Sequence, residues 1–375
     1  MAGSTFGNHF KITTWGESHG KGIGVVVDGC PAGLPLDKAD IQKFLDRRKP
    51  GQSKFSTQRQ EADAVEILSG TFEGRTTGTP ISLVVFNKDQ RSRDYGDIAS
   101  YYRPGHADYT FDQKYGFRDY RGGGRSSGRE TIGRVAGGAI ACKLLERLGV
   151  SFLTYARSIG PVSIPQTPDL LLAKPSAEIS QQVLSNPLYM PDLESSAKAQ
   201  DFLSACMKQT NSAGGVIECM ITGVPAGIGE PVFDKLDANL AKAIFSIGAV
   251  KGFEIGDGFA AATSTGLENN DSFEAADGHI ATSTNHAGGI LGGISNGSPI
   301  IFRAAIKPTP SIASPQKTVT SSGEPIEISI HGRHDPIIVP RAVVVVESMA
   351  ALALLDLMME HMAVRAEWME TFYQL

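Results

Sequence analysis

The sequence lacks the cysteine patterns, apolar runs and N-terminal signals that mark several protein classes. Only four cysteines occur in 375 residues, with no C-x-x-C pair and no histidine at zinc-finger spacing, so we expect structural thiols and no metal site. These are Cys30, Cys142, Cys206 and Cys219. No run approaches the roughly 18 apolar residues of a membrane helix, because Glu347 and Asp356 interrupt residues 343 to 359. The N-terminus resembles no targeting peptide, so we expect a cytoplasmic protein with no membrane segment.

Charged residues are also scarce overall, but they concentrate locally. They make up 20% of the chain, below the usual fraction of about 25%, and the net charge is -5. This balance argues against a protein that coats long nucleic acids. Basic residues nevertheless gather between positions 47 and 59 and between positions 103 and 134. Such clusters in an acidic chain indicate a compact anionic ligand.

An internal echo bears on the fold. Residues 25 to 33, followed by Asp37 and Asp40, recur as residues 220 to 227, followed by Asp234 and Asp237. Each copy predicts a β-branched strand, a Pro/Gly turn and an aspartate-capped helix. Either the two segments share similar turn residues by chance, or an α/β unit is duplicated. The matched order of elements favours duplication, with halves at about residues 1–150 and 212–375.

The stretch from about residue 160 to 211 lies between these halves. Its segments 176–184 and 197–208 show helical periodicity, which predicts a helical excursion. A linker between independent domains is the alternative. The motifs described below draw on both halves, which favours one composite domain over residues 1–375.

Two histidine-bearing turns are candidates for proton transfer. Residues 13 to 20 follow a predicted short strand at 10–12 and place Ser18 and His19 between two glycines. Imidazole moves protons near neutral pH, although His19 could instead merely tie down a loop. In the turn 103 to 108, Arg103 would hold His106 neutral until an anion arrives, unless His106 is only a surface residue.

Residues 121 to 130 form a glycine-rich segment with several arginines. Ser127 and Glu130 fit a capping box before a helix that runs to a glycine stop at Gly149. Backbone amides, the helix dipole and guanidinium groups all favour a phosphate there. The segment is not a Walker A loop, because Arg129 and Glu130 replace Lys-Ser/Thr. A disordered RGG-type RNA-binding segment is the alternative.

The second half carries further glycine- and proline-rich loops. Glycines at 288–289 and 292–293 precede a predicted strand at 299–306, and the loop 307–311 follows it. Lys307 and Arg333 could meet a second phosphate, and two phosphate sites fit a cofactor plus a substrate. Asp335 beside Arg333 is either a catalytic group or half of a structural ion pair.

Taken together, these segments resemble one enzyme family. GESHG at 16–20, DRRKPGQS at 46–53, RPGHADYT at 103–110, RGGGRSSGRET at 121–131, KPTPS at 307–311, and GRHDP and PRA within 332–342 are similar to the signature segments of chorismate synthases, in the family's order. The resemblance implies an α/β fold with α+β-type layers, a β-α-β sandwich with helices between two sheets that agrees with the internal pseudo-duplication. It also implies a homotetramer.

The resemblance implies a lyase of the shikimate pathway, which serves aromatic amino acid biosynthesis. Its reaction is the anti-1,4-elimination of phosphate from 5-enolpyruvylshikimate 3-phosphate to give chorismate. The reaction needs reduced FMN without net redox change, so NADPH would act only indirectly, through an external flavin reductase or reductant. By the same resemblance, His19 would protonate the departing phosphate, His106 would act as an acid near the flavin, and Asp335 would work with the flavin as proton acceptor.

The binding residues are carried over position by position. FMN contacts are expected at Arg125, Ser126, Ser127, Gly248, Ala249, Gly292, Lys307, Pro308, Thr309, Pro310, Ser311 and Arg333. Arg48 and Lys54 match the family's proposed phosphate-nucleotide or substrate contacts, and Ser18 is also expected to bind the substrate. Arg129 and Arg134 are further substrate candidates because of their places on the predicted helix. Two positions depart from the family: Gly248 replaces a common asparagine, which removes a possible hydrogen bond to flavin, and Gly128 replaces a common alanine at the helix start.

Two other functions compete with this interpretation. A phosphoryl transferase could use the same arginines, but it would need a set of metal-binding carboxylates and a nucleotide loop that the sequence does not display. An RNA- or anion-binding module would bind without chemistry, and its affinity would collapse with salt.

Overall fold

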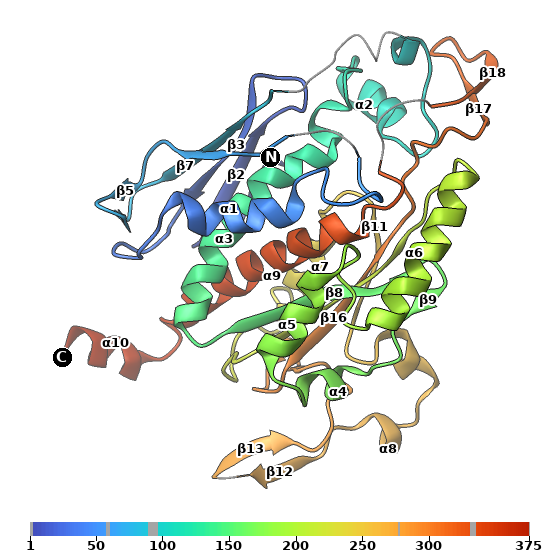
Figure 1. Ribbon diagram of the computed structural model, residues 1–375. Coiled ribbons are helices and arrows are strands. Elements are labelled where there is room, and N and C mark those ends of the chain that lie inside the picture. Colours follow the sequence, from blue (N-terminus) through green and yellow to red (C-terminus); the bar gives the residue numbers. More distant parts are fainter. Residues whose placement is uncertain (1–2, 58–60, 89–96, 277, 331–334, 375) are drawn as a thin grey trace.

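The computed structural model describes residues 3–57, 61–88, 97–276, 278–330 and 335–374 (Figure 1). Its first sheet comes from the N-terminal part of the chain and is antiparallel throughout. The strand order is β1 (Thr5–Phe6), β2 (Lys11–Gly16), β3 (Gly22–Asp28), β7 (Ile81–Phe86) and β4 (Val65–Ile67). Alternate residues of β3, namely Ile23, Val25 and Val27, are fully buried, so one face of the sheet covers the core. The strand predicted at residues 10–12 was too short, since β2 continues to Gly16.

The second sheet is formed by later segments and is also antiparallel. Its order is β11 (Val250–Ile255), β16 (Ile300–Ile306), β10 (Gly215–Thr222), β8 (Ser151–Ile159) and β9 (Val162–Ser163). Buried side chains such as Ile217, Cys219 and Phe302 line its inner face. The strand predicted at residues 299–306 is therefore confirmed as β16.

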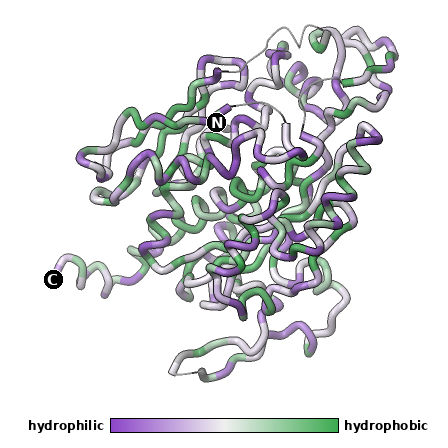
Figure 2. Tube along the Cα trace, in the orientation of Figure 1, coloured by the Kyte–Doolittle hydropathy of each residue, from purple (hydrophilic) through white to green (hydrophobic). Residues whose placement is uncertain are grey.

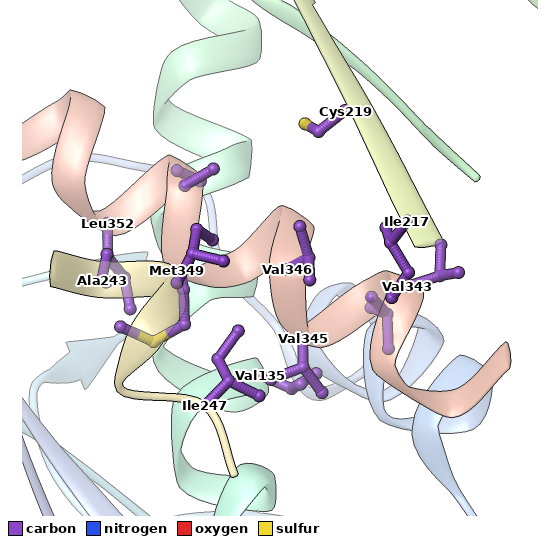
Figure 3. Packing of buried hydrophobic residues seen from close by; sticks show 14 of the residues in the cluster. Val135, Ile217, Cys219, Ala243, Ile247, Val343, Val345, Val346, Met349 and Leu352 are labelled. Carbon is purple, nitrogen blue, oxygen red and sulfur yellow. The ribbon is translucent and has the colours of Figure 1, made fainter. Parts of the chain in front are cut away.

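A layer of helices separates the two sheets. Helix α3 (Thr131–Arg147) packs on the first sheet, α9 (Val339–His361) packs on the second, and the two helices pack on each other. Helices α1 (Lys38–Arg48) and α7 (Leu236–Phe245) flank them. Figure 3 shows Val346 and Met349 of α9 among buried side chains from β10, α3 and the α7 region. This β-α-β layering is the fold class expected from the sequence.

Helix α9 lies in the middle of the molecule, where Figure 2 shows many hydrophobic residues in green. Within the described residues it alone is long and apolar enough to cross a membrane, but most of its apolar stretch is buried in the fold. The two acidic residues that interrupt this apolar stretch, Glu347 and Asp356, have partners inside the protein. Glu347 forms an ion pair with Arg47 at 2.7 Å, and Asp356 accepts hydrogen bonds from the backbone N–H groups of residues 8 to 10. The two acidic residues therefore do not exclude a membrane span, contrary to the expectation from the sequence. The burial of α9 between the sheets indicates instead that it is a core helix.

The remaining elements lie around this sandwich. The helical excursion consists of α4 (Pro168–Leu172), α5 (Ser176–Ser185) and α6 (Leu193–Lys208). Smaller helices are α2 (Asp108–Tyr115), α8 (Gly266–Asn269) and α10 (Ala366–Tyr373), and α10 lies apart from the body (Figure 1). Short strand pairs are β5 (Thr71–Phe72) with β6 (Arg75–Thr76), β12 (Phe273–Ala276) with β13 (His279–Thr282), β14 (Ile290–Leu291) with β15 (Ile294–Ser295), and β17 (Gln316–Val319) with β18 (Pro325–Ile328).

The two strand-turn-helix units of the internal echo are present as β3 with α1 and β10 with α7. Asp37 caps α1 through a capping box with Asp40, as expected. The second cap was predicted wrongly, because α7 begins after Lys235 without a side-chain cap. Whether the halves are duplicates, and form one domain, stays a prediction.

The close approach of α3 and α9 depends on Gly138. A Cβ at this position would lie 2.3 Å from Ser348 Cβ and 2.7 Å from its Cα. Because backbone atoms cannot move aside without shifting α9, we expect Gly138→Ala to lower the free energy of unfolding by about 2 kcal/mol, measured by urea denaturation.

Gly266→Ala is the matched control, since a Cβ there meets no atom within 4 Å. It should change stability by less than about 0.5 kcal/mol. Equal stability of the two variants would contradict the packing argument.

Candidate active site

A cavity of about 220 Å³ lies where loops from distant parts of the chain converge. Its walls come from the segment after α1, the turn before α2, the glycine-rich loop before α3, the loop after β16 and the start of α9. The lining residues are Pro50, Thr57, Arg103, His106, Gly122, Gly123, Ser126, Ser127, Gly128, Arg129, Thr309, Ser311, Asp335 and Arg341. Seven of them were predicted as site residues: His106, Ser126, Ser127, Arg129, Thr309, Ser311 and Asp335.

The glycine-rich loop forms one wall because three successive glycines adopt positive φ. Gly122, Gly123 and Gly124 have φ values of 63°, 84° and 53°. The capping box predicted between Ser127 and Glu130 does not form. Ser127 Oγ accepts the N–H of Arg129 at 3.4 Å and begins a short 3-10 turn, Gly128–Glu130, which precedes α3. The glycine stop is confirmed, since α3 ends at Arg147 and Gly149 has a φ of 83°.

His19 lies directly behind this wall. It is buried, and its Nδ1 is 3.1 Å from Ser18 Oγ, which in turn donates to the Gly122 carbonyl at 3.3 Å. A Cβ on Gly122 would lie 2.2 Å from the His19 ring. The structure therefore brings Ser18 and His19 to the edge of the site through a glycine contact, although neither lines the cavity.

His106 joins two loops across the cavity. Its Nε2 is 2.8 Å from Ser311 Oγ, and its Nδ1 is 3.1 Å from the Pro104 carbonyl. Because a carbonyl only accepts, Nδ1 carries the proton in that hydrogen bond, and Nε2 of the neutral ring accepts from Ser311. Lys307 donates to the Gly105 carbonyl at 2.7 Å, which ties the same two loops together.

The charge of Arg103 is matched by a carboxylate. Its guanidinium and backbone N–H all donate to Asp108, with side-chain distances of 2.8 Å. Although burial opposes the effect, these hydrogen bonds and the Arg103 charge lower the pKa of Asp108 below its ordinary value. The cavity therefore faces an ion pair at this point rather than the lone arginine that the sequence suggested.

Asp335 is held from two directions. Its Oδ1 accepts the backbone N–H of Thr57 at 2.8 Å, and its Oδ2 pairs with Arg341 Nη1 at 2.6 Å. Arg341 also donates through Nε to the Arg48 carbonyl at 2.9 Å. The predicted partner Arg333 lies outside the described residues, so Arg341 is the ion-pair partner that the structure shows.

A network of buried arginines and carboxylates reaches the cavity through Arg129. Arg48 is 1% exposed and lies 3.6 Å from Asp63, and its guanidinium makes no hydrogen bond among the described residues. Burial lowers the pKa of Arg48 to about 9, while Asp63 counteracts this. Arg129 pairs with Glu61 at 2.7 Å and with Asp63 at 3.2 Å. A buried cation with unmet donors suits an anionic ligand.

Other predicted residues lie away from the cavity. The Arg125 guanidinium donates to the carbonyls of residues 14 and 16, so it braces the β2 end. Arg134 binds Glu130, and Lys54 is exposed over the Phe55 ring. The remaining predicted positions that do not line the cavity are Gly248, Ala249, Gly292, Pro308 and Pro310. Ala249 nevertheless accepts the Lys307 N–H at 2.9 Å, which places it beside the 307–311 loop.

Sequence reasoning gave no role to Arg341, Thr57 or Asp63. Arg341 belongs to the family segment PRA, so its sequence context could have indicated a role. Nothing in the sequence indicates a role for Asp63, since a single acidic residue in a loop is usually a solvated side chain. Among the described residues, no group of three or more His, Cys, Asp or Glu side chains could hold a metal ion.

The contact between Gly122 and His19 can be tested without a ligand. We expect Gly122→Ala to move the His19 ring, seen as a change in its NMR signals, and to destabilise the protein by about 1 kcal/mol or more through the positive φ. Gly116→Ala is the matched control, because Gly116 also has a positive φ, of 79°, but a Cβ there would meet no atom within 4 Å. It should leave the His19 signals unchanged; a shift in both variants would mean that backbone strain alone moves the ring.

The chain is similar to known proteins over nearly its whole length. A family model described as chorismate synthase matches residues 10–359. The chorismate synthase of Agathobacter rectalis is 66% identical over 374 residues, which span 100% of both chains. That of Methanosarcina barkeri is 57% identical and covers 96% of this chain and 97% of its own. A crystal structure of a chorismate synthase, 31% identical, matches with a TM-score of 0.77 over 98% of this chain and 97% of that one. The chain therefore belongs to the chorismate synthase family, the lyases that carry out the last step of the shikimate pathway.

Proposed function

We propose that the cavity binds reduced FMN together with 5-enolpyruvylshikimate 3-phosphate, and that phosphate leaves by anti-1,4-elimination to give chorismate. The observation that carries this proposal is the meeting of His106, Asp335 and the Ser126–Ser127 loop around one cavity. We also propose a cytoplasmic homotetramer that depends on an external reductant.

The lining of the cavity fits a flavin with a phosphate. The Thr309 hydroxyl is buried and has no hydrogen-bond partner among the described residues, so a ligand can supply one. Ser126, Ser127 and Ser311 offer further hydroxyl groups. These residues would hold FMN, which when bound supplies electron density to the substrate as phosphate leaves.

The two histidines are proposed to hold the protons that the reaction needs. Ser18 orients the His19 ring through Nδ1, and Nε2 would deliver a proton to the departing phosphate. The neutral His106 ring has Nε2 as its basic atom, so an arriving anion favours a proton there. His106 would then act as an acid near the flavin.

Asp335 is proposed to take up the proton that the substrate loses. Its carboxylate lies in the cavity wall and is fixed by Thr57 and Arg341. Arg48 and Arg129 supply positive charge to the substrate's phosphate and carboxylates. Lys54 and Arg134 remain proposed substrate contacts, and Arg125, Gly248, Ala249, Gly292, Lys307, Pro308, Pro310 and Arg333 remain proposed FMN contacts.

The first test is an anaerobic assay of the purified protein with the substrate and chemically reduced FMN, following phosphate and chorismate together. Equal release of both products is expected. His19→Ala and His106→Ala should each lower kcat about 100-fold or more, because each removes a proton donor.

His9→Ala is the control, because the exposed His9 side chain lies outside the cavity. It should leave kcat unchanged. Full activity of both active-site variants would refute the assignment of the acids, and FMN binding without any turnover would refute the reaction.

The dependence on an external reductant is a separate prediction. We expect the purified chain to make no chorismate from the substrate when given oxidised FMN and NADPH alone, and to become active once chemically reduced FMN is added. Turnover with NADPH alone, measured by chorismate absorbance, would show that the chain reduces its own flavin.

A further inference from the structure

Among the described arginines that line the cavity, Arg341 contacts two proposed functional elements at once. It lies in the first turn of α9, and its side chain is 20% exposed. Nη1 pairs with Asp335 Oδ2 at 2.6 Å, and Nε donates to the Arg48 carbonyl at 2.9 Å. One guanidinium thus joins the proposed proton acceptor to the end of α1.

The position of Asp335 depends on this contact. Among the described residues its only other partner is the Thr57 backbone N–H at 2.8 Å. A backbone donor fixes one oxygen but leaves the carboxylate able to rotate about it. The second hydrogen bond, charge-assisted and short, sets the plane of the group. Arg341 therefore decides where the free lone pairs of Asp335 point.

Arg341 itself is poorly placed to grip an anion. A guanidinium binds phosphate or carboxylate in a bidentate manner through Nη1 with Nη2, or through Nε with one Nη. Because Nε and Nη1 are both engaged inside the protein, neither edge is fully open. This geometry distinguishes Arg341 from a substrate-binding arginine, although it lines the same cavity.

We propose that Arg341 is a positioning residue that aligns Asp335 for proton transfer and ties it to the Arg48 segment. The proposal rests on the proposed function, in which Asp335 accepts the proton. This proposal assigns a role to the PRA segment at residues 340–342, for which the sequence predicted no role.

The test compares Arg341→Met with Arg341→Lys under the anaerobic assay. Methionine keeps the length but removes both hydrogen bonds, so kcat should fall about 10- to 100-fold while KM changes less than about threefold. Lysine can restore the charge beside Asp335 but not both contacts, so it should recover part of kcat. The kinetic isotope effect with substrate deuterated at the departing hydrogen should increase in Arg341→Met.

Two controls separate positioning from general loss of structure. Arg47→Met breaks a comparable ion pair between α1 and α9, with Glu347 at 2.7 Å, away from the cavity. It should leave the isotope effect unchanged. In the Asp335→Asn background, Arg341→Met should cause no further loss of kcat, because the residue that it aligns is already disabled.

A binding measurement completes the test. The Kd for FMN, followed by flavin fluorescence, should stay within about threefold of wild type in Arg341→Met. A large rise in KM, a large rise in the FMN Kd, or additive effects with Asp335→Asn would overturn the proposal and make Arg341 a ligand-binding residue. If the wild type is active and Arg341→Met has an unchanged kcat, only the positioning role of Arg341 is overturned. If the wild type is inactive, the proposed function and this inference are overturned together.

Discussion

The contact between α3 and α9 is the constraint on which the rest of the structure depends. Gly138 lets the two helices approach so closely that no side chain fits between them at Ser348. Each helix packs on one sheet, so the contact joins two separately paired sheets into a single core. Glycine is needed here for space rather than for backbone freedom, because it lies within α3.

This packing also places the active site. Both helices begin at the cavity, α3 after the glycine-rich loop and α9 beside Asp335 and Arg341. The N-terminal ends of both helices therefore lie near the site where anions are expected, and such helix ends favour negative charge. A shift of one helix against the other would separate the loop that carries Ser127 from the wall that carries Asp335.

Most arginines around the site already form ion pairs with carboxylates of the protein, so their charges are not neutralised by a ligand alone. Arg103 pairs with Asp108, Arg129 with Glu61 and Asp63, and Arg341 with Asp335. These pairs join buried or half-buried groups, whose removal from water costs much free energy unless their geometry is held. Arg48 is different, because its guanidinium lacks hydrogen bonds among the described residues. It is the cation best placed to gain from an anion's arrival.

Much of the local structure could be predicted from patterns in the chain. The amphipathic segments 176–184 and 197–208 are helical, the strand after residue 299 is present, and Gly149 ends α3 as expected. Local errors arose where tertiary contacts compete with capping. Glu130 binds Thr14 and Arg134 instead of closing a capping box, since those partners come from outside the loop.

The sequence by itself determined the family, the layered fold class and seven of the fourteen cavity residues, because these depend on side-chain chemistry at fixed spacing. Only the tertiary structure decided that Arg341 is the partner of Asp335, that Asp63 lies between Arg48 and Arg129, and that His19 sits behind Gly122. Those contacts join residues from separate loops, and their distances are set by how the helices pack between the sheets, which no local pattern encodes.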